Sequence, residues 1–157
     1  MSETALNSKS RVRCREIMTQ QVSTVTPEMS LYDAAKRMKE GDIGVLPVIE
    51  NDTNKLVGII TDRDIVVRAI AEEKLVRETF VGAIMTAEVF TAKPEDFAFE
   101  AIRTMGDRQV RRVPIIDDNG ILQGIVSIAD VALEMEDERE IAETLEEISS
   151  GKSFWSK

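Results

Sequence analysis

The residues best suited to chemistry in this sequence are a hydroxyl and a carboxylate that recur at one spacing. The stretches "GIITDRD" and "GIVSIAD" each place an aspartate three residues after a hydroxyl residue. The two pairs are Thr61 with Asp64 and Ser127 with Asp130. On spacing alone, each pair is a capping box, in which the hydroxyl and the carboxylate accept hydrogen bonds from free backbone N–H groups at a helix start.

The glycines of these stretches support a second interpretation, a ligand site. Gly58 and Gly124 stand inside predicted strands, where glycine is unfavourable unless something approaches the backbone closely. A hydroxyl at a helix start lies beside free N–H groups and the positive end of the helix dipole, which favour phosphate. A carboxylate can accept hydrogen bonds from both hydroxyls of a ribose. The pattern therefore fits a nucleoside phosphate pocket as well as a cap, and the two are compatible.

Both stretches belong to a repeat that covers most of the chain. "EIMTQQVSTVTPEMSLYDAAKRMKEGDIGVLPVIE" aligns with "AIMTAEVFTAKPEDFAFEAIRTMGDRQVRRVPIID" at an offset of 67, which places Met18 on Met85. After the next loop the offset is 66, because "ENDTNKL" is replaced by the shorter "DDNGIL". A turn tolerates such a deletion, so both loops are predicted to be hairpin connections.

Each repeat predicts the element order β-α-β-β-α. A short helix at "REIM" or "VGAIM" leads to a brief strand, "VSTV" or "VFTA". The helix that follows is expected to end at Gly41 or Gly106 through a left-handed glycine. Two strands around a turn then run into the last helix, at "DIVVRAIAEE" or "ADVALEMEDE". The predicted fold class is α/β, of the α+β kind, with two tandem repeats.

The two long predicted helices carry small apolar residues at helical spacing. Such a face allows close packing, and the helices flank a thin pair of sheets. We expect a second subunit to cover part of these faces, around Ala34, Ala35, Ala101 and Ile102.

Composition argues against several classes of protein. A chain of 157 residues with 43% hydrophobic content suits one compact core. No apolar run approaches the roughly 20 residues that cross a bilayer, and "MSETALNSKS" is no secretory signal, so a cytoplasmic protein without membrane contact is expected. Histidine is absent and Cys14 is the single cysteine, expected to be a small buried or half-buried residue. Both facts argue against a metal site and against histidine-based catalysis.

Charge is unevenly distributed along the chain. The net charge of −9 argues against nucleic-acid binding, and the basic residues Lys9, Arg11, Arg13 and Arg15 are interpreted as a solvated arm rather than a nucleic-acid contact. Residues 134–147 contain eight acidic residues and one basic residue.

This acidic segment predicts a C-terminal helix. Ile141, Leu145 and Ile148 form a narrow apolar stripe along it. The helix is expected to pack on its own or a sister subunit, and the alternative is a docking helix for a separate effector protein.

Taken together, the "IMT" openings, the "PV" strand and "GIITDRDI" resemble a tandem pair of CBS (cystathionine-β-synthase) domains, covering Arg15 to about Met135. The chain is most similar to stand-alone prokaryotic members of that family. The resemblance implies a pseudo-two-fold pair that binds AMP, ATP or NAD between its repeats and forms a homodimer. The expected divisions are an arm (1–14), repeat 1 (15–76), repeat 2 (77–136) and a C-terminal helix and tail (137–157).

The resemblance also implies that each ligand pocket is assembled across the pair. The hydroxyl and aspartate of one repeat would meet the first strand and the proline strand of the other. Pocket A would join Thr61 and Asp64 to Val89, Phe90, Arg111, Arg112 and Pro114, and pocket B would join Ser127 and Asp130 to Val22, Ser23, Gly44, Val45 and Pro47.

The two pockets are predicted to differ in charge. Arg111 and Arg112 take the place that Gly44 and Val45 have in the other repeat, so only pocket A offers guanidinium groups to a phosphate chain. The alternative is that the arginines are strand-edge charges that discourage aggregation. Arg63 likewise fits either a phosphate contact or an ion pair with a neighbouring aspartate.

The expected function is therefore a regulatory module that senses an adenine nucleotide, requires no cofactor and signals to an unknown effector protein. One alternative is a small enzyme that acts on a nucleotide, with Asp64 or Asp130 as its base. No histidine, metal cluster, activated nucleophile or Walker-type glycine loop supports that alternative. The other alternative is a structural dimer with empty pockets.

Overall fold

The structure, a computed structural model, describes residues 11–134 and Glu146. The expected C-terminal helix lies almost wholly outside the described residues. The described chain forms two compact units. Unit 1 contains residues 11–20, 90–117 and 123–134, and unit 2 contains residues 21–89 and 118–122.

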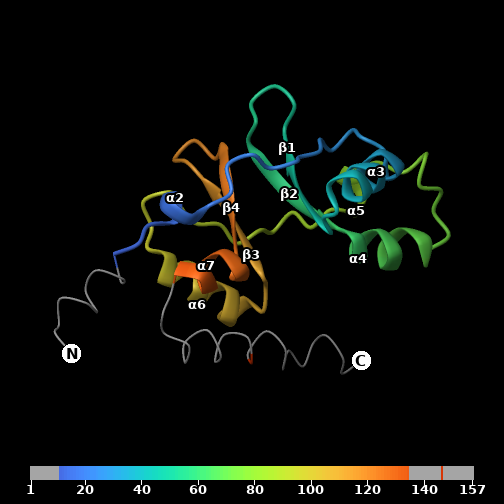
Figure 1. Cartoon of the computed structure of the whole chain (residues 1–157). Helices are drawn as coiled ribbons and strands as arrows, with labels where there is room; N and C mark the ends of the chain where they lie inside the picture. Colours follow the sequence, from blue (N-terminus) through green and yellow to red (C-terminus); the bar gives the residue numbers. More distant parts are fainter. Residues whose placement is uncertain (1–10, 135–145, 147–157) are drawn as a thin grey trace. The chain divides into compact units, whose positions relative to one another are not determined.

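Both units combine helices with a two-stranded sheet, so the mixed α/β class and the two tandem repeats are confirmed (Figure 1). Unit 1 holds α2 (Cys14–Ile17), α6 (Ala98–Arg108), β3 (Arg112–Ile116), α7 (Ile128–Glu134) and all but the first residue of β4 (Leu122–Ser127). Unit 2 holds α3 (Leu31–Gly41), β1 (Val45–Ile49), β2 (Leu56–Thr61), α4 (Asp62–Ile65), η1 (Val66–Ile70) and α5 (Val81–Ile84).

The two predicted hairpins are confirmed. Strands β1 and β2 pair antiparallel, with Val45 opposite Thr61, and β3 pairs with β4. Aliphatic, largely β-branched residues such as those in "VLPVI" and "RVPII" favour strands. Each connecting turn has a left-handed residue at the same repeat position, Asn54 at φ 59° and Gly120 at φ 82°. Asparagine and glycine adopt this conformation most easily, so both loops can close despite their different lengths.

The ends of the long helices differ from the prediction. We expected Gly41 and Gly106 to be left-handed, but the left-handed residues are Asp42 at φ 50° and Gln109 at φ 56°. The next backbone N–H, that of Ile43 at the end of α3, donates to a carbonyl five residues earlier in the helix (3.0 Å). This hydrogen bond closes a Schellman-type end and offsets the strain of a non-glycine residue.

The predicted strands "VSTV" and "VFTA" are reduced to single bridges. Val25 N–H donates to Pro47 O, and Ala92 N–H donates to Pro114 O, both at 3.1 Å and in parallel pairing. A proline stands two residues after each bridging residue and cannot donate the next ladder hydrogen bond. These segments therefore touch the hairpins at one residue each.

The opening segment of each repeat, which is its first short helix and the residues just after it, pairs with the hairpin of the other repeat. The segment after α2 pairs with β4, where Thr19 N–H donates to Ile125 O (2.9 Å). The segment after α5 pairs with β2, where Thr86 N–H donates to Ile59 O (2.9 Å). Each spatial unit is thus built from the opening of one sequence repeat and the hairpin of the other.

Each unit has its own apolar core. Helices α6 and α7 pack together in unit 1 (Figure 1). Within residues 11–134, no helix is long and apolar enough to cross a membrane. The core of unit 2 includes Leu31, Leu46, Val48, Ile60 and Val81, and that of unit 1 includes Met105, Val113, Ile115, Val126 and Val131.

Burial corrects the expected dimer surface. Ala34 is 0% exposed, and Ala101 and Ile102 are each 1% exposed, within a single chain. A second subunit cannot cover side chains that their own core already covers, so these three positions were wrongly assigned to a subunit contact. Ala35 alone of the four is exposed.

Cys14 is buried, as expected, and burial raises the pKa of its thiol to about 11, with the Asp96 and Glu100 carboxylates adding to the effect. The thiolate is the reactive form, so a thiol reagent at pH 8 should label Cys14 only as fast as the protein opens. Because the folded pKa is raised, the unfolded chain ionises this thiol first. The free energy of unfolding is therefore unaffected by the thiol below its ordinary pKa of 9.0 and falls as pH rises from there towards 11.

Chemical denaturation between pH 8 and 11 measures this effect. Cys14→Ala should flatten the pH dependence over that window. An equal loss of stability with pH in the variant would show that other groups cause it.

Candidate functional site

The first hydroxyl and aspartate pair forms a complete capping box at the start of α4. Asp64 N–H donates to Thr61 Oγ1 (3.0 Å), and Thr61 N–H donates to Asp64 Oδ2 (3.0 Å). Both side chains are partly buried. The capping interpretation is therefore confirmed for this pair.

The second pair repeats this geometry at the start of α7. Asp130 N–H donates to Ser127 Oγ (3.2 Å), and Ser127 N–H donates to Asp130 Oδ2 (3.0 Å). In both boxes the carboxylate uses Oδ2 for the cap. A carboxylate oxygen has two lone pairs, so Oδ1 in each box retains capacity to accept hydrogen bonds from ligand hydroxyls.

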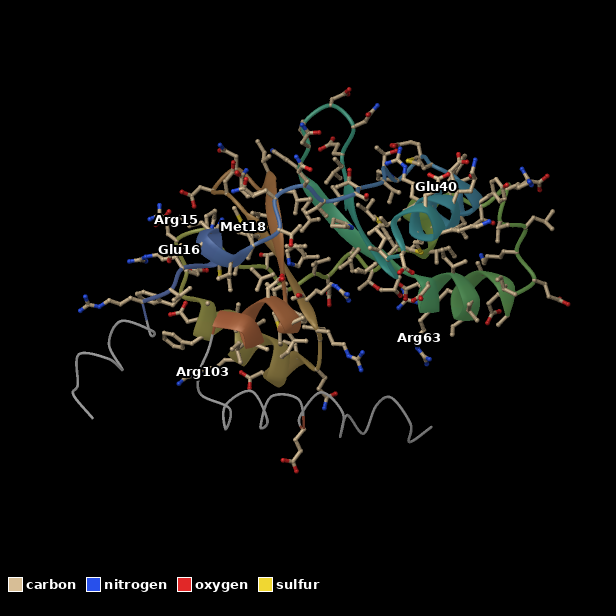
Figure 2. The ribbon with its side chains drawn as sticks, in the orientation of Figure 1. Arg15, Glu16, Met18, Glu40, Arg63 and Arg103 are labelled. Atoms are coloured by element: carbon tan, nitrogen blue, oxygen red, sulfur yellow. The ribbon has the colours of Figure 1, made fainter. Side chains whose placement is uncertain are left out.

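The strand glycines have a different role from the one predicted. A Cβ on Gly124 would lie 2.7 Å from Thr19 O and 2.9 Å from Met18 Sδ. A Cβ on Gly58 would lie 2.7 Å from Met85 Sδ. The close approach is thus made by the exchanged opening segments, and Met18 lies beside β4 (Figure 2). Ligand access does not explain these glycines.

Different residues surround the two capping boxes. Gly44 O accepts from Asp62 N–H (2.9 Å) at the start of α4, and a Cβ on Gly44 would lie 2.9 Å from Asp62 Oδ2. At the start of α7, Arg111 O accepts from Ile128 N–H (2.9 Å). The backbone at the start of each helix is therefore bonded to the residue at the same repeat position, Gly44 for α4 and Arg111 for α7.

Sequence analysis missed Arg68, which contacts the first box. Its Nε lies 3.8 Å from Asp64 Oδ1. Its Nη1 donates to Ile84 O (3.0 Å) and to Thr86 Oγ1 (3.2 Å). The spacing of four residues from Asp64 to Arg68 on a predicted helix was the available signal. The adjacent Arg63 is exposed and points outward from α4 (Figure 2).

An exposed aromatic residue of the predicted site also has a cationic neighbour. Phe90 is 40% exposed, and the Arg108 guanidinium lies 4.3 Å from the centroid of its ring. Arg111 and Arg112 are exposed in the same unit. Three arginines and one aromatic ring thus belong to the end of α6, the start of β3 and the segment before Ala92.

The two prolines of the predicted site are buried. Pro47 O and Pro114 O accept the single parallel bridges from Val25 and Ala92. The prolines therefore fix the position of neighbouring residues and offer little surface of their own.

The predicted site residues are divided between the units, so the grouping into pockets A and B stays a prediction. Each pocket as predicted takes its residues from both units. Unit 2 holds Val22, Ser23, Gly44, Val45, Pro47, Thr61, Asp64 and Val89, and unit 1 holds Phe90, Arg111, Arg112, Pro114, Ser127 and Asp130.

No group of three or more possible metal ligands occurs among residues 11–134 and Glu146.

Known relatives have this repeat and this fold. The chain is 36% identical over 119 residues to the CBS domain-containing protein YhcV of Bacillus subtilis, covering 76% of this chain and 82% of that protein. The solved CBS domain pair of protein MJ0100, in complex with 5′-methylthioadenosine and S-adenosyl-L-methionine, has a TM-score of 0.68 and 29% identity, covering 78% of this chain and 94% of that one.

A second solved relative is CBSX2 in complex with AMP, with a TM-score of 0.68 and 26% identity, covering 78% of this chain and 94% of that one. The sequence model of the CBS domain matches residues 14–70 and 81–137. These two matches start at the two opening helices and end beyond the two capping boxes. The chain therefore belongs to the CBS domain family and contains two copies of the domain.

Proposed function

We propose that this protein is a regulatory CBS pair, without catalytic activity, that binds an adenine nucleotide such as AMP, ATP or NAD. AMP, 5′-methylthioadenosine and S-adenosyl-L-methionine, the ligands of the two solved relatives, have adenosine in common. The proposal extends that shared chemistry to this chain.

The observation that carries the proposal is the pair of capping boxes. In each, Oδ2 of the aspartate accepts the hydrogen bond of the helix start, and Oδ1 can accept from a ligand hydroxyl; in the first box, Oδ1 also lies 3.8 Å from Arg68 Nε. Asp64 is partly buried, with a side chain 15% exposed, so a hydrogen bond to it is protected from water. Two cis hydroxyls of a ribose match an acceptor of this kind, which gives the carboxylate a second role besides the cap.

Pockets A and B remain our assignment of the residues around each ligand. Aliphatic side chains such as Val22, Val45 and Val89 would bury the adenine, and the polar groups would fix its orientation. Arg111 and Arg112 would meet phosphate in pocket A, whereas Gly44 and Val45 leave pocket B without that charge.

We further propose a cytoplasmic homodimer that acts on an unknown effector protein without contacting nucleic acid or membrane. With Ala34, Ala101 and Ile102 buried, the helix surface left for a subunit contact includes Val66, Val67 and Ile70. These three side chains are 54%, 45% and 57% exposed.

Sedimentation velocity at micromolar concentration measures the assembly directly, and a species of only 17.5 kDa would contradict the homodimer.

Equilibrium dialysis against AMP, ATP, NAD and S-adenosylmethionine tests the function. Saturable binding with unchanged ligand after prolonged incubation supports a non-catalytic sensor. Conversion of the ligand would favour the nucleotide-acting enzyme, with Asp64 or Asp130 as base. Failure to bind any of the four would favour a structural dimer.

Charge in pocket A can be tested by Arg111→Ala and Arg112→Ala. Each variant should weaken ATP binding by about tenfold and adenosine binding far less, because charge-assisted hydrogen bonds are made to phosphate and not to adenosine. Calorimetric titration with AMP, ATP and adenosine measures the difference. Arg103→Ala, at an exposed position of α6, is a control for losing one surface guanidinium. Equal losses for adenosine and ATP would remove the phosphate assignment.

A further inference from the structure

Arg68 connects two segments of unit 2 that are remote in sequence. One end of its guanidinium faces the capping-box carboxylate, with Nε 3.8 Å from Asp64 Oδ1. The other end donates through Nη1 to Ile84 O (3.0 Å) and Thr86 Oγ1 (3.2 Å). A planar guanidinium makes such contacts from separate nitrogens in a fixed plane, whereas a lysine ammonium has all its donors on one nitrogen.

The local helix geometry places Arg68 at this junction. Arg68 lies in η1, a π-helix in which Ala71 N–H donates to Val66 O (2.9 Å), five residues earlier. Short π-helical segments change the direction of the side chains that follow an α-helical turn and are frequent at functional sites. Arg68 follows Asp64 by four residues and therefore lies on the same side of the helix.

Arg68 faces Asp64 Oδ1, the carboxylate oxygen that takes no part in the capping box. Asp64 Oδ2 accepts from Thr61 N–H, and Oδ1 faces Arg68. The Arg68 side chain is 49% exposed, so solvent weakens the attraction between the two charges. The contact still has a geometric effect: with Oδ2 hydrogen bonded to the cap and Oδ1 facing a cation, the carboxylate favours one orientation towards an incoming donor.

At its other end, Arg68 contacts the segment that closes over β2. Thr86 exchanges two hydrogen bonds of 2.9 Å with Ile59, next to the position where Met85 lies against Gly58. Three residues later the same segment reaches Val89, a residue of the proposed pocket A. Arg68 thus pairs with the Asp64 carboxylate and is hydrogen bonded to the segment that leads to Val89, within unit 2.

We propose that Arg68 is a positioning residue that orients the Asp64 carboxylate for a ligand hydroxyl and couples occupancy of that carboxylate to the segment 84–89. This inference rests on the proposed function of Asp64. It assigns the coupling to one pocket, because the residue four positions after Asp130 is Glu134, which has the charge of Asp130 itself. That position cannot supply a guanidinium to the second box.

The experiment compares Arg68→Met, Arg68→Lys and a matched control, Arg77→Met, in the full chain. Arg77 is also exposed, lies in unit 2 and stacks on Tyr32, with its guanidinium 3.8 Å from the ring centroid. Two quantities are measured: amide hydrogen exchange of residues 84–89, with and without AMP, and the AMP dissociation constant from calorimetry.

Loss of the Arg68 hydrogen bonds in Arg68→Met should speed exchange at Thr86 by about fivefold without ligand. It should also weaken AMP binding about fivefold and abolish AMP-induced protection of residues 84–89. Arg68→Lys restores a charge near Asp64 but cannot span both contacts, so it should recover affinity and not protection. Arg77→Met should match the unmodified protein in exchange without ligand, in AMP-induced protection and in AMP affinity.

Several outcomes overturn the proposal. Exchange and affinity in Arg68→Met that equal those of Arg77→Met would show that Arg68 positions nothing. Full recovery of protection by lysine would reduce its role to charge. If the unmodified protein binds no AMP, ATP or NAD, the proposed function and ligand orientation both fail, but exchange at Thr86 without ligand still decides whether Arg68 holds this segment.

Discussion

Gly124→Val should lower the free energy of unfolding by about 3 kcal/mol, at the upper end of the usual cost of overpacking a core. A Cβ at this position would lie 2.7 Å from Thr19 O, a distance that real Cβ contacts essentially never reach. Thr19 cannot move away freely, because its N–H and its O both bond to Ile125. For a chain of this size the melting temperature should fall by roughly 5 to 10 °C, as measured by circular dichroism.

Gly120→Asn is the matched control for Gly124→Val. Gly120 has φ 82° in the β3–β4 turn, and a Cβ there would meet nothing within 4 Å. Asparagine already occupies the corresponding left-handed position, Asn54, in the other hairpin. This variant should therefore melt within about 1 °C of the unmodified protein, since the added side chain removes no contact and substitutions of that kind are usually near neutral. An equally small change in Gly124→Val would mean that the opening segment does not press on β4.

Asp64→Ala and Asp130→Ala should each weaken adenine-nucleotide binding at one pocket by about tenfold to a hundredfold. Each variant removes a charged hydrogen-bond acceptor for ribose, which costs on the order of 1.5 to 3 kcal/mol. Each also removes half of a capping box, so some stability is lost as well. Calorimetry with AMP measures the affinity, and thermal melting of the unliganded variants measures the second effect.

Asp96→Ala separates these two effects. Asp96 Oδ2 accepts from Lys93 N–H (2.8 Å), the same three-residue arrangement as in the capping boxes, but in the turn before α6. This control should lose stability to a similar degree and bind AMP normally. Unchanged AMP binding in both capping-box variants would leave Thr61, Asp64, Ser127 and Asp130 as helix caps with no ligand role.

The features that sequence predicted correctly depend on residues close together in the chain. A capping box needs two residues three positions apart, and a hairpin needs two aliphatic strands around a short polar turn. The aliphatic strands, their turn residues and the repetition of both motifs at offsets of 67 and 66 can be identified from the sequence alone. The element order of the repeat followed from the same local signals.

The errors concern contacts between residues far apart in the chain. The atoms that crowd Gly124 belong to Met18 and Thr19, more than a hundred positions earlier, so the glycine was assigned to ligand access. Helix periodicity marked Ala34 as apolar but could not tell a core contact from a subunit contact. The role of Arg68 likewise depends on Ile84 and Thr86, which no helical spacing connects to it.

The exchange of opening segments also constrains how the protein is made. During synthesis, the hairpin β1–β2 leaves the ribosome before the Met85–Thr86 segment that covers Gly58. Residues 11–20 are likewise made long before their partner strand β4. At synthesis rates of 5 to 20 residues per second, the interval from Thr19 to Ile125 lasts about 5 to 20 seconds. During that time the "REIM" segment has no permanent partner, so a nascent chain halted between the repeats would present it to chaperones and proteases.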